Sequence, residues 1–162
     1  MSTLTRGRLR DKARPVTTSI QSLIASARRS GDWKPVLDAV PYFRFLGVGL
    51  RERDGRLEAH MAFSDHLVGN PTIPALHGGT LGALLEAVAQ CEVLYRAESV
   101  VLPKTITLTI DYLRSGKPVG TTATATVLKH GRRVATVQAR AFQDDPNAPI
   151  AVATVHLLVR AD

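Results

Sequence analysis

An acid and a histidine–glycine–glycine sequence share one apolar stretch of this chain, "ALHGGTLGALLEAVAQ" (residues 75–90). Apolar residues recur there at helical spacing, and at about 100° per residue Leu81, Leu84 and Val88 fall on one face. The opposite face carries small residues and Glu86. A helix that is apolar on both faces is usually buried, and an isolated buried carboxylate is costly. We therefore expect Glu86 to lie at a wet opening or to have a chemical task.

The start of this helix offers groups that could polarise a carbonyl oxygen. A helix N-terminus presents backbone N–H donors that have no intrahelical partner, at the positive end of the helix dipole. Gly78 and Gly79 would let a ligand approach that backbone closely. The sequence His77, Gly78, Gly79 is thus a candidate oxyanion site, and Glu86 is a candidate general base or nucleophile.

Both assignments have structural alternatives. Glu86 could be an acid that is salt-bridged across a dimer interface, and His77 could be a cap whose ring bonds to nearby backbone. Cys91 lies on the same apolar helix and is interpreted as a packed small residue rather than a nucleophile. Metal binding is not expected, because the remaining histidines show no ligand spacing: His60, His66, His130 and His156.

The elements that must position these residues can be read from the hydrophobic pattern. Helical spacing predicts helices over 17–29 and about 33–39, which end at Gly31 and Pro41. The apolar stretch 42–50 is expected to be a connection that enters a first strand. Alternation of apolar and polar residues, or enrichment in threonine and valine, predicts strands over 55–63, 104–113, 119–130, 133–142 and 150–160.

The order of these elements indicates an α+β fold, a curved antiparallel sheet wrapped around the long central helix. The strands after the helix are expected to form an antiparallel meander. Small residues on them would let the sheet curve closely over the helix: Ala123, Ala125, Ala139, Ala151 and Ala153. We divide the chain into a basic flexible arm (1–16), a helical extension (17–41) and the α+β domain (42–162).

Length and composition fit one globular domain. The chain has 162 residues, of which 44% are apolar and 22% charged. No apolar run approaches the roughly 18 residues of a membrane span, and no secretory signal opens the chain, so no membrane association is expected. The single cysteine, Cys91, excludes an internal disulfide framework and favours a cytoplasmic location.

The net charge of +7 is concentrated at the N-terminus. Five basic residues and one acidic residue give the segment 1–14 a net charge of +4. We interpret it as a solvated, mobile arm; contact with an anionic partner and a role as a transit peptide are the alternatives. Nucleic-acid binding is not expected, because aromatic residues make up only 5% of the chain and form no stacking platform.

The stretch "GNPTIPALHGGTLGALLEAVA" resembles the signature of the hot-dog fold acyl-CoA thioesterases, in the branch related to the phenylacetate-degradation thioesterase. In that branch HGG opens the central helix and an acid follows nine positions after the histidine, as Glu86 follows His77. The segments "TLTIDYLRSGKP", "GRR" and "AVATVHLL" also resemble the later strands of the family. The resemblance covers about 42–160.

This resemblance implies hydrolysis of acyl-CoA thioesters without a metal or redox cofactor; coenzyme A enters only as part of the substrate. It implies a homo-oligomer, a dimer or a dimer of dimers, whose sheets join and whose active sites lie at the dimer interface. Glu86 would be the nucleophile or the general base, and Gly78 would offer its backbone N–H to the thioester oxygen. His77 would hold that corner of the site, and Gly79 would contact the substrate.

The sequence departs from the family pattern at two positions. Pro71 stands six positions before His77, where the family often has asparagine or glutamine, and Asn70 precedes it and could deliver its amide instead. Gln90 stands four positions after the acid, where some members hold the attacking water with serine or threonine. Asn70 and Gln90 are therefore added to the predicted catalytic residues.

Two further interpretations concern substrate and function. Arg132 and Arg133 could bind the phosphates of coenzyme A, or they could be a solvated hairpin tip. The first functional alternative is a catalytically weak acyl-CoA-binding module on the same fold. An acyl-CoA hydratase would need a histidine–aspartate pair that this spacing does not supply, and nucleic-acid binding through residues 1–14 would depend steeply on salt.

Overall fold

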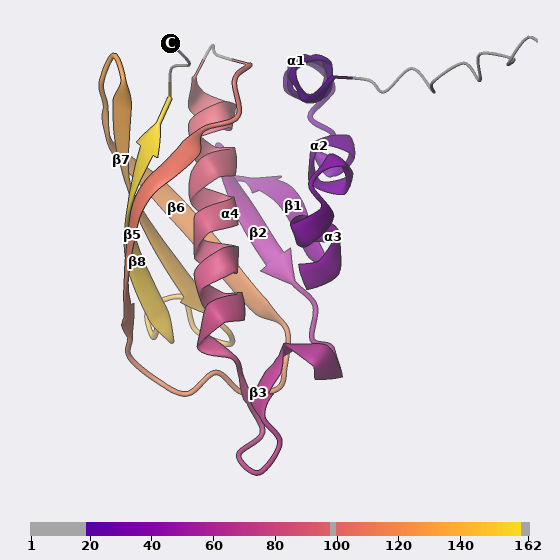
Figure 1. Ribbon diagram of the computed structural model, residues 1–162, viewed down its shortest axis with the longest axis vertical. Coiled ribbons are helices and arrows are strands. Elements are labelled where there is room, and N and C mark those ends of the chain that lie inside the picture. Colours follow the sequence, from indigo (N-terminus) through magenta and orange to yellow (C-terminus); the bar gives the residue numbers. More distant parts are fainter. Residues whose placement is uncertain (1–18, 98–99, 160–162) are drawn as a thin grey trace, which may run out of the picture.

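A six-stranded antiparallel sheet curves around one long helix, α4 (Gly78–Arg96), with three shorter helices on the other side of that helix (Figure 1). The computed structural model describes residues 19–97 and 100–159. Its main sheet has the order β1-β2-β6-β7-β8-β5. These strands are β1 (Val48–Arg53), β2 (Arg56–Met61), β5 (Lys104–Tyr112), β6 (Thr121–His130), β7 (Val134–Phe142) and β8 (Ala151–Leu158).

Rows of alanine line the face of the sheet that packs on α4. Ala123, Ala141 and Ala151 are cross-strand neighbours on β6, β7 and β8, and all three are fully buried. A second row repeats the pattern with Ala125, Ala139 and Ala153. Small side chains let the sheet approach the leucine-rich helix closely, so this use of alanine is as the sequence predicted. The predicted α+β architecture of a curved sheet around a central helix is confirmed.

The strands after the helix differ from the expected meander in one respect. β6, β7 and β8 follow one another, but β5 pairs with β8, through Tyr112 and Ala151 among others, and not with β6. β5 therefore lies at an edge of the sheet, beside α4 (Figure 1). Because strand order depends on non-local pairing, the alternation within each strand could not reveal it.

The helical extension begins with α1 (Ile20–Ser30) and α2 (Lys34–Ala39), close to the predicted helices. The Ser19 hydroxyl accepts the N–H of Ser22 at the start of α1, and Gly31 ends the helix in the left-handed conformation, with φ 75°. The Arg28 guanidinium donates to the carbonyl oxygen of Leu94. The extension is thus attached to the C-terminal half of α4. The predicted arm and the first residues of the predicted extension lie outside the described residues.

The connection expected over 42–50 is wrong in its first part, because Pro41–Leu46 form a third helix, α3. Proline is favoured at the first position of a helix, so Pro41 starts α3 as well as closing the preceding segment. The strand β1 follows and forms a hairpin with β2 through Asp54 and Gly55, both of which have positive φ. That pattern is typical of a two-residue type I′ turn.

A small hairpin precedes the long helix. The 3₁₀ turn η1 (Asp65–Leu67) leads into β3 (Val68–Asn70), which pairs with β4 (Ala75–Leu76). The N–H of His77 donates to the carbonyl oxygen of Leu67, at 2.8 Å, so this hairpin is attached to the start of α4. No helix among the described residues is long and apolar enough to cross a membrane.

Candidate active site

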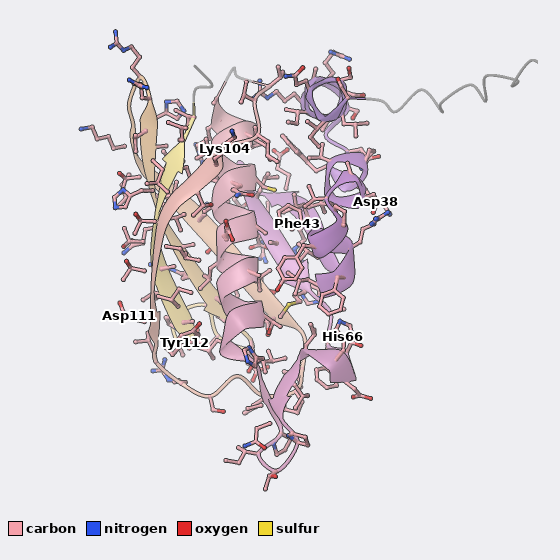
Figure 2. The ribbon with its side chains drawn as sticks, in the orientation of Figure 1. Asp38, Phe43, His66, Lys104, Asp111 and Tyr112 are labelled. Atoms are coloured by element: carbon pink, nitrogen blue, oxygen red, sulfur yellow. The ribbon has the colours of Figure 1, made fainter. Side chains whose placement is uncertain are left out.

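One stripe of α4 packs directly on the edge strand β5 (Figure 2). A Cβ atom on Gly78 would lie 3.1 Å from the ring of Tyr112, and one on Gly82 would lie 2.8 Å from the Cδ1 atom of Ile110. A side chain at Gly78 would therefore require the Tyr112 ring to move, and one at Gly82 would displace the terminal methyl group of Ile110. Two residues of the small-residue face predicted for this helix, Gly82 and Gln90, thus lie against β5.

Glu86 lies on the same stripe, one turn after Gly82 and one turn before Gln90. Its side chain is partly buried, and the Nε2 atom of Gln90 donates to Glu86 Oε1 at 3.4 Å and to Thr105 Oγ1 at 3.2 Å. No cation pairs with Glu86 within residues 19–97 and 100–159. The carboxylate therefore keeps capacity to accept a proton or to approach a ligand.

His77 is the N-cap of α4. Its Nδ1 atom accepts the N–H of Gly79 at 2.9 Å, so the proton of the neutral ring is on Nε2. Its carbonyl oxygen accepts the N–H groups of Thr80 and Leu81, at 2.9 and 3.3 Å. In the described part of the chain the N–H of Gly78 has no partner. Of the first-turn donors, Gly78 is thus the one available to a ligand oxygen.

Asn70 lies in the hairpin that contacts this helix N-terminus. The preceding residue, Gly69, is packed against His77, because a Cβ atom there would be 2.9 Å from His77 Cα and Cδ2. The Asn70 Oδ1 atom accepts the N–H of Thr72 at 2.9 Å, which stabilises the turn. The structure therefore brings Asn70 near the cap but uses its oxygen within its own hairpin.

The two halves of the predicted catalytic set are separated along the helix. Gly78 and Glu86 are eight residues apart on α4, which at 1.5 Å per residue is about 12 Å, more than two turns. A thioester carbonyl group is much smaller than this distance. Within one chain the structure groups His77 with Gly78 and Gly79, and groups Glu86 with Gln90, but does not bring the two groups together.

Arg132 and Arg133 are exposed in the hairpin between β6 and β7, far from the helix N-terminus. The row of the sheet that contains Val134 and Lys104 lies seven residues along β7 from the row of Ala141 and Tyr112. At about 3.3 Å per residue this is roughly 23 Å. Lys104 and Tyr112 lie at opposite ends of β5 in Figure 2. The structure therefore places the two arginines at the end of the sheet near Gln90.

Sequence reasoning missed a second acid on α4, Glu92. Its side chain is fully buried; Oε2 accepts the N–H of Leu57 at 2.9 Å, and the Arg96 guanidinium pairs with Oε1. The spacing of an acid and an arginine at positions i and i+4 could have indicated this ion pair. Tyr112 and Thr105 were also missed, because their contacts with α4 come from a strand more than ten residues away.

Cys91 is buried, in agreement with its interpretation as a packed residue. Burial raises the pKa of its thiol from 9.0 to about 12, and the nearby Glu92 carboxylate adds to this effect. A thiol with so high a pKa is not a nucleophile near neutral pH. No group of three or more histidine, cysteine, aspartate or glutamate side chains that could hold a metal ion occurs in the described residues.

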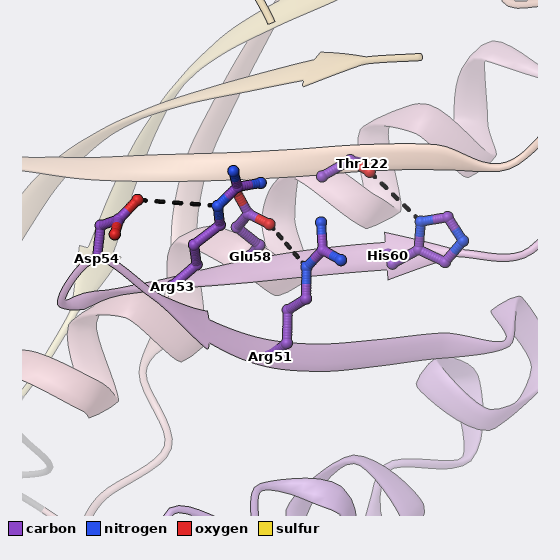
Figure 3. A network of polar contacts seen from close by, with 6 residues as sticks. All are labelled: Arg51, Arg53, Asp54, Glu58, His60 and Thr122. Carbon is purple, nitrogen blue, oxygen red and sulfur yellow. Dashed lines mark hydrogen bonds and ion pairs between the residues drawn. The ribbon is translucent and has the colours of Figure 1, made fainter. Parts of the chain in front are cut away.

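A hollow of about 640 Å³ lies on the outer face of the sheet, where residues of β1, β2, β6 and β7 line it. Figure 3 shows polar contacts among its lining residues: Arg51 pairs with Glu58 at 2.7 Å, and Arg53 lies 3.8 Å from Asp54. The described residues that line this hollow include none of the predicted site residues. It is separated by the sheet from the face of α4 that carries Glu86.

Comparison with known proteins identifies the family. The acyl-CoA thioesterase N-terminal domain matches residues 69–158, which include the whole of α4 and the strands β5 to β8. The chain belongs to the acyl-CoA thioesterase family. As a member of this family it is a thioester hydrolase, and the resemblance to hot-dog fold thioesterases is confirmed.

Relatives of this thioesterase include the medium/long-chain acyl-CoA thioesterase YigI of Salmonella typhimurium, 32% identical over 65% of this chain and 77% of that protein. YigI of Escherichia coli K12 is 31% identical over 74% of this chain and 86% of that protein. A crystal structure from Chromobacterium violaceum has a TM-score of 0.70 and 33% identity, covering 85% of this chain and 96% of that one. The crystal structure of a phenylacetic acid degradation-related protein from Ralstonia eutropha JMP134 has a TM-score of 0.69 and 26% identity, covering 85% of this chain and 99% of that one.

Proposed function

We propose that this thioesterase hydrolyses acyl-CoA esters to a free acid and coenzyme A, with Glu86 as general base or nucleophile. The observation that carries the proposal is a partly buried carboxylate on the helix whose N-terminus presents the Gly78 N–H; within the described residues neither the carboxylate has a cation partner nor the N–H a hydrogen-bond acceptor. Medium- to long-chain acyl groups are proposed as substrates, because the YigI relatives bear that description.

The chemistry assigns one task to each group. The Gly78 N–H donates to the thioester oxygen and stabilises the negative charge that develops on it. Glu86 takes a proton from water as the water oxygen bonds to the carbonyl carbon; the C–S bond then breaks, and the proton passes to the thiolate of coenzyme A. The Gln90 amide, which already contacts the carboxylate, orients Glu86 or the water. This reaction needs no metal or redox cofactor.

A dimer with shared sites would resolve the separation of about 12 Å between Gly78 and Glu86 along α4. A twofold axis at the level of Gly82 would set the two α4 helices in opposite directions, so that Glu86 of one subunit would lie level with Gly78 of the other. β5 offers the surface for it, because its outer edge leaves backbone groups unpaired and Ile106, Tyr112 and Leu113 are exposed. A dimer of dimers would build on the same unit.

Mixing two inactive variants tests this arrangement. Glu86→Gln and Gly78→Pro subunits should each form inactive homodimers, because proline removes the proposed N–H donor and is tolerated at the first position of a helix. If the sites are shared, a heterodimer has one site with both defects and one with neither, so an equal mixture should regain about a quarter of the wild-type activity. If each site lies within one subunit, the mixture should stay inactive, and the shared site would be rejected.

Arg132 and Arg133 are proposed to contact the phosphates of coenzyme A. Their exposed hairpin lies near the Gln90 end of α4, away from the reacting carbonyl, where a non-reacting part of the substrate would bind. Replacing both by alanine should raise KM for coenzyme A esters and leave KM for short thioesters that lack the nucleotide unchanged. Equal effects on both substrates would show that the arginines form only a solvated hairpin tip.

A panel of acyl-CoA esters of increasing chain length, assayed with a thiol-detecting reagent, tests the activity itself. Release of coenzyme A by the wild type and its loss in Glu86→Gln would support the proposal. Binding of acyl-CoA by the wild type without release of the thiol would instead identify an acyl-CoA-binding module, the alternative that the departures at Pro71 and Gln90 leave open. A cytoplasmic location is inferred from the single, reduced Cys91.

A further inference from the structure

We propose that Tyr112 is a positioning residue that fixes the direction of the Gly78 N–H. The inference rests on the proposed function, in which this N–H binds the thioester oxygen. Tyr112 lies at the end of β5, and its hydroxyl donates to the carbonyl oxygen of Gly78 at 2.8 Å (Figure 2). Tyr112 binds the carbonyl oxygen of Gly78, whereas the proposed catalytic group is the N–H of the same residue. Tyr112 must therefore affect that N–H through the backbone of Gly78.

The peptide unit between Gly78 and Gly79 is held at both ends. Tyr112 binds its carbonyl oxygen, and the Nδ1 atom of His77 accepts its N–H at 2.9 Å. One bond comes from the residue before the helix and the other from a strand 34 residues further along the chain. This peptide plane cannot rotate without the loss of one of these hydrogen bonds.

The preceding peptide unit, between His77 and Gly78, carries the catalytic N–H. Its carbonyl oxygen accepts the N–H of Thr80 at 2.9 Å, the N–H of Leu81 at 3.3 Å and the hydroxyl of Thr80 at 2.7 Å. Its N–H is left without a partner in the described residues. The carbonyl end of this unit is therefore anchored and the N–H end points to the site.

Both planes must be fixed because the residue between them is a glycine. Glycine has access to many more φ and ψ values than other residues, and Gly79 follows it, so the side chains of this turn do little to restrict its backbone. Holding the plane on each side of Gly78 sets its φ and ψ, and with them the direction of the N–H. Tyr112 is the contact in this set that comes from outside the helix and its cap.

The ring of Tyr112 adds a steric restraint to the hydrogen bond. Its Cζ, Oη and Cε1 atoms lie 3.1 to 3.3 Å from where a Cβ atom of Gly78 would be. The ring thus leaves Gly78 little space to move toward β5. Replacement by phenylalanine keeps this contact and removes only the hydroxyl, so Tyr112→Phe isolates the hydrogen bond.

Tyr112→Phe should lower kcat for an acyl-CoA ester about three- to tenfold, the effect of one neutral hydrogen bond, and should leave KM within a factor of about two. KM should hold because Tyr112 contacts the enzyme's own backbone and the donor matters most as charge develops on the oxygen. Tyr42→Phe is the matched control, since Tyr42 is 50% exposed against 53% for Tyr112 and has no hydrogen bond from its hydroxyl in the described residues. A wild-type kcat in Tyr112→Phe would overturn the inference.

A second measurement does not depend on activity. In ¹H–¹⁵N spectra of the full chain, Tyr112→Phe should shift the amide signals of Gly78 and Gly79, and Tyr42→Phe should not. Unchanged glycine signals would overturn the proposed restraint. If the wild type releases no thiol from any acyl-CoA ester, the proposed function fails, and the spectra still decide whether Tyr112 holds this peptide unit. If the wild type is active and Tyr112→Phe is equally active, only the role of Tyr112 fails.

Discussion

The two carboxylates on α4, Glu86 and Glu92, are six residues apart and have opposite surroundings. Glu92 is fully buried, and both of its oxygens have partners: the N–H of Leu57 and the guanidinium of Arg96. Glu86 is only partly buried, and in the described part of the chain its one hydrogen-bond partner is the Gln90 side-chain amide, at 3.4 Å. Burial of the side chain alone would single out Glu92 as the unusual acid. The number of hydrogen-bond and ion-pair partners instead singles out Glu86.

This difference teaches how to separate structural acids from candidate catalytic ones. A buried carboxylate whose oxygens are all bound contributes to the fold, because the loss of either partner leaves an uncompensated group. A partly exposed carboxylate with free acceptor capacity can take a proton or approach a substrate. The surroundings of α4 differ in the same way along its length. The helical extension and the β1–β2 hairpin hold its C-terminal half, and the edge strand β5 lies along the part that precedes Glu86.

The sharpest test of the comparison is the same substitution at both acids. Glu86→Gln should lower kcat at least about a hundredfold, the lower range of general-base catalysis, with little change in the free energy of unfolding. Glu92→Gln, the matched control, should keep kcat per folded molecule. Thiol release and urea unfolding of both variants decide the matter. Normal kcat in folded Glu86→Gln would remove it from the site.

Glu92→Ala should have the converse effect. Removal of the carboxylate leaves the buried N–H of Leu57 and one side of Arg96 without a partner, so the free energy of unfolding should fall by about 3 kcal/mol. Urea denaturation measures this change, and Glu92→Gln should lose less, because an amide oxygen can still accept the N–H of Leu57. If Glu92→Ala is as stable as the wild type, the assignment of Glu92 to the fold is wrong.

Gln90→Ala probes the one hydrogen bond that Glu86 makes within residues 19–97 and 100–159. Loss of the amide should lower kcat about three- to tenfold, as expected for one hydrogen bond, with the fold unchanged. Gln138→Ala is the control, because Gln138 is an exposed glutamine on β7. Equal kcat in the two variants would show that Gln90 does not act on the carboxylate or its water.

Much of this arrangement could be predicted from local patterns. The apolar spacing and the histidine–glycine–glycine sequence located α4 and its cap, and alternation located the strands. Even the separation of Gly78 and Glu86 follows from the rise of a helix. These features depend on residues close in sequence, which is why they were accessible.

Features that depend on distant pairing were not accessible. The place of β5 at the edge of the sheet decides that Tyr112 and Thr105 face α4, and no periodicity within the strand carries that information. α3 was missed because Pro41 was interpreted as an end rather than as a first helical residue. The roles of the site residues and the domain boundaries stay predictions.

Cys91 provides the smallest and most specific test of the packed region around Glu92. Burial, with a smaller contribution from the Glu92 carboxylate, raises the pKa of Cys91 from 9.0 to about 12. Between these values the unfolded chain has lost the thiol proton and the folded chain keeps it, so the folded state binds more protons and loses stability as pH rises. This contribution is therefore complete below about pH 9 and should fall by about 1 kcal/mol between pH 8 and pH 10.

Urea unfolding at both pH values should show the loss in the wild type, and Cys91→Ala should lack it. If both proteins lose stability equally, the thiol is not protected as the structure indicates. Persistence of the slope in Glu92→Gln would show that burial, and not the neighbouring carboxylate, is its main cause.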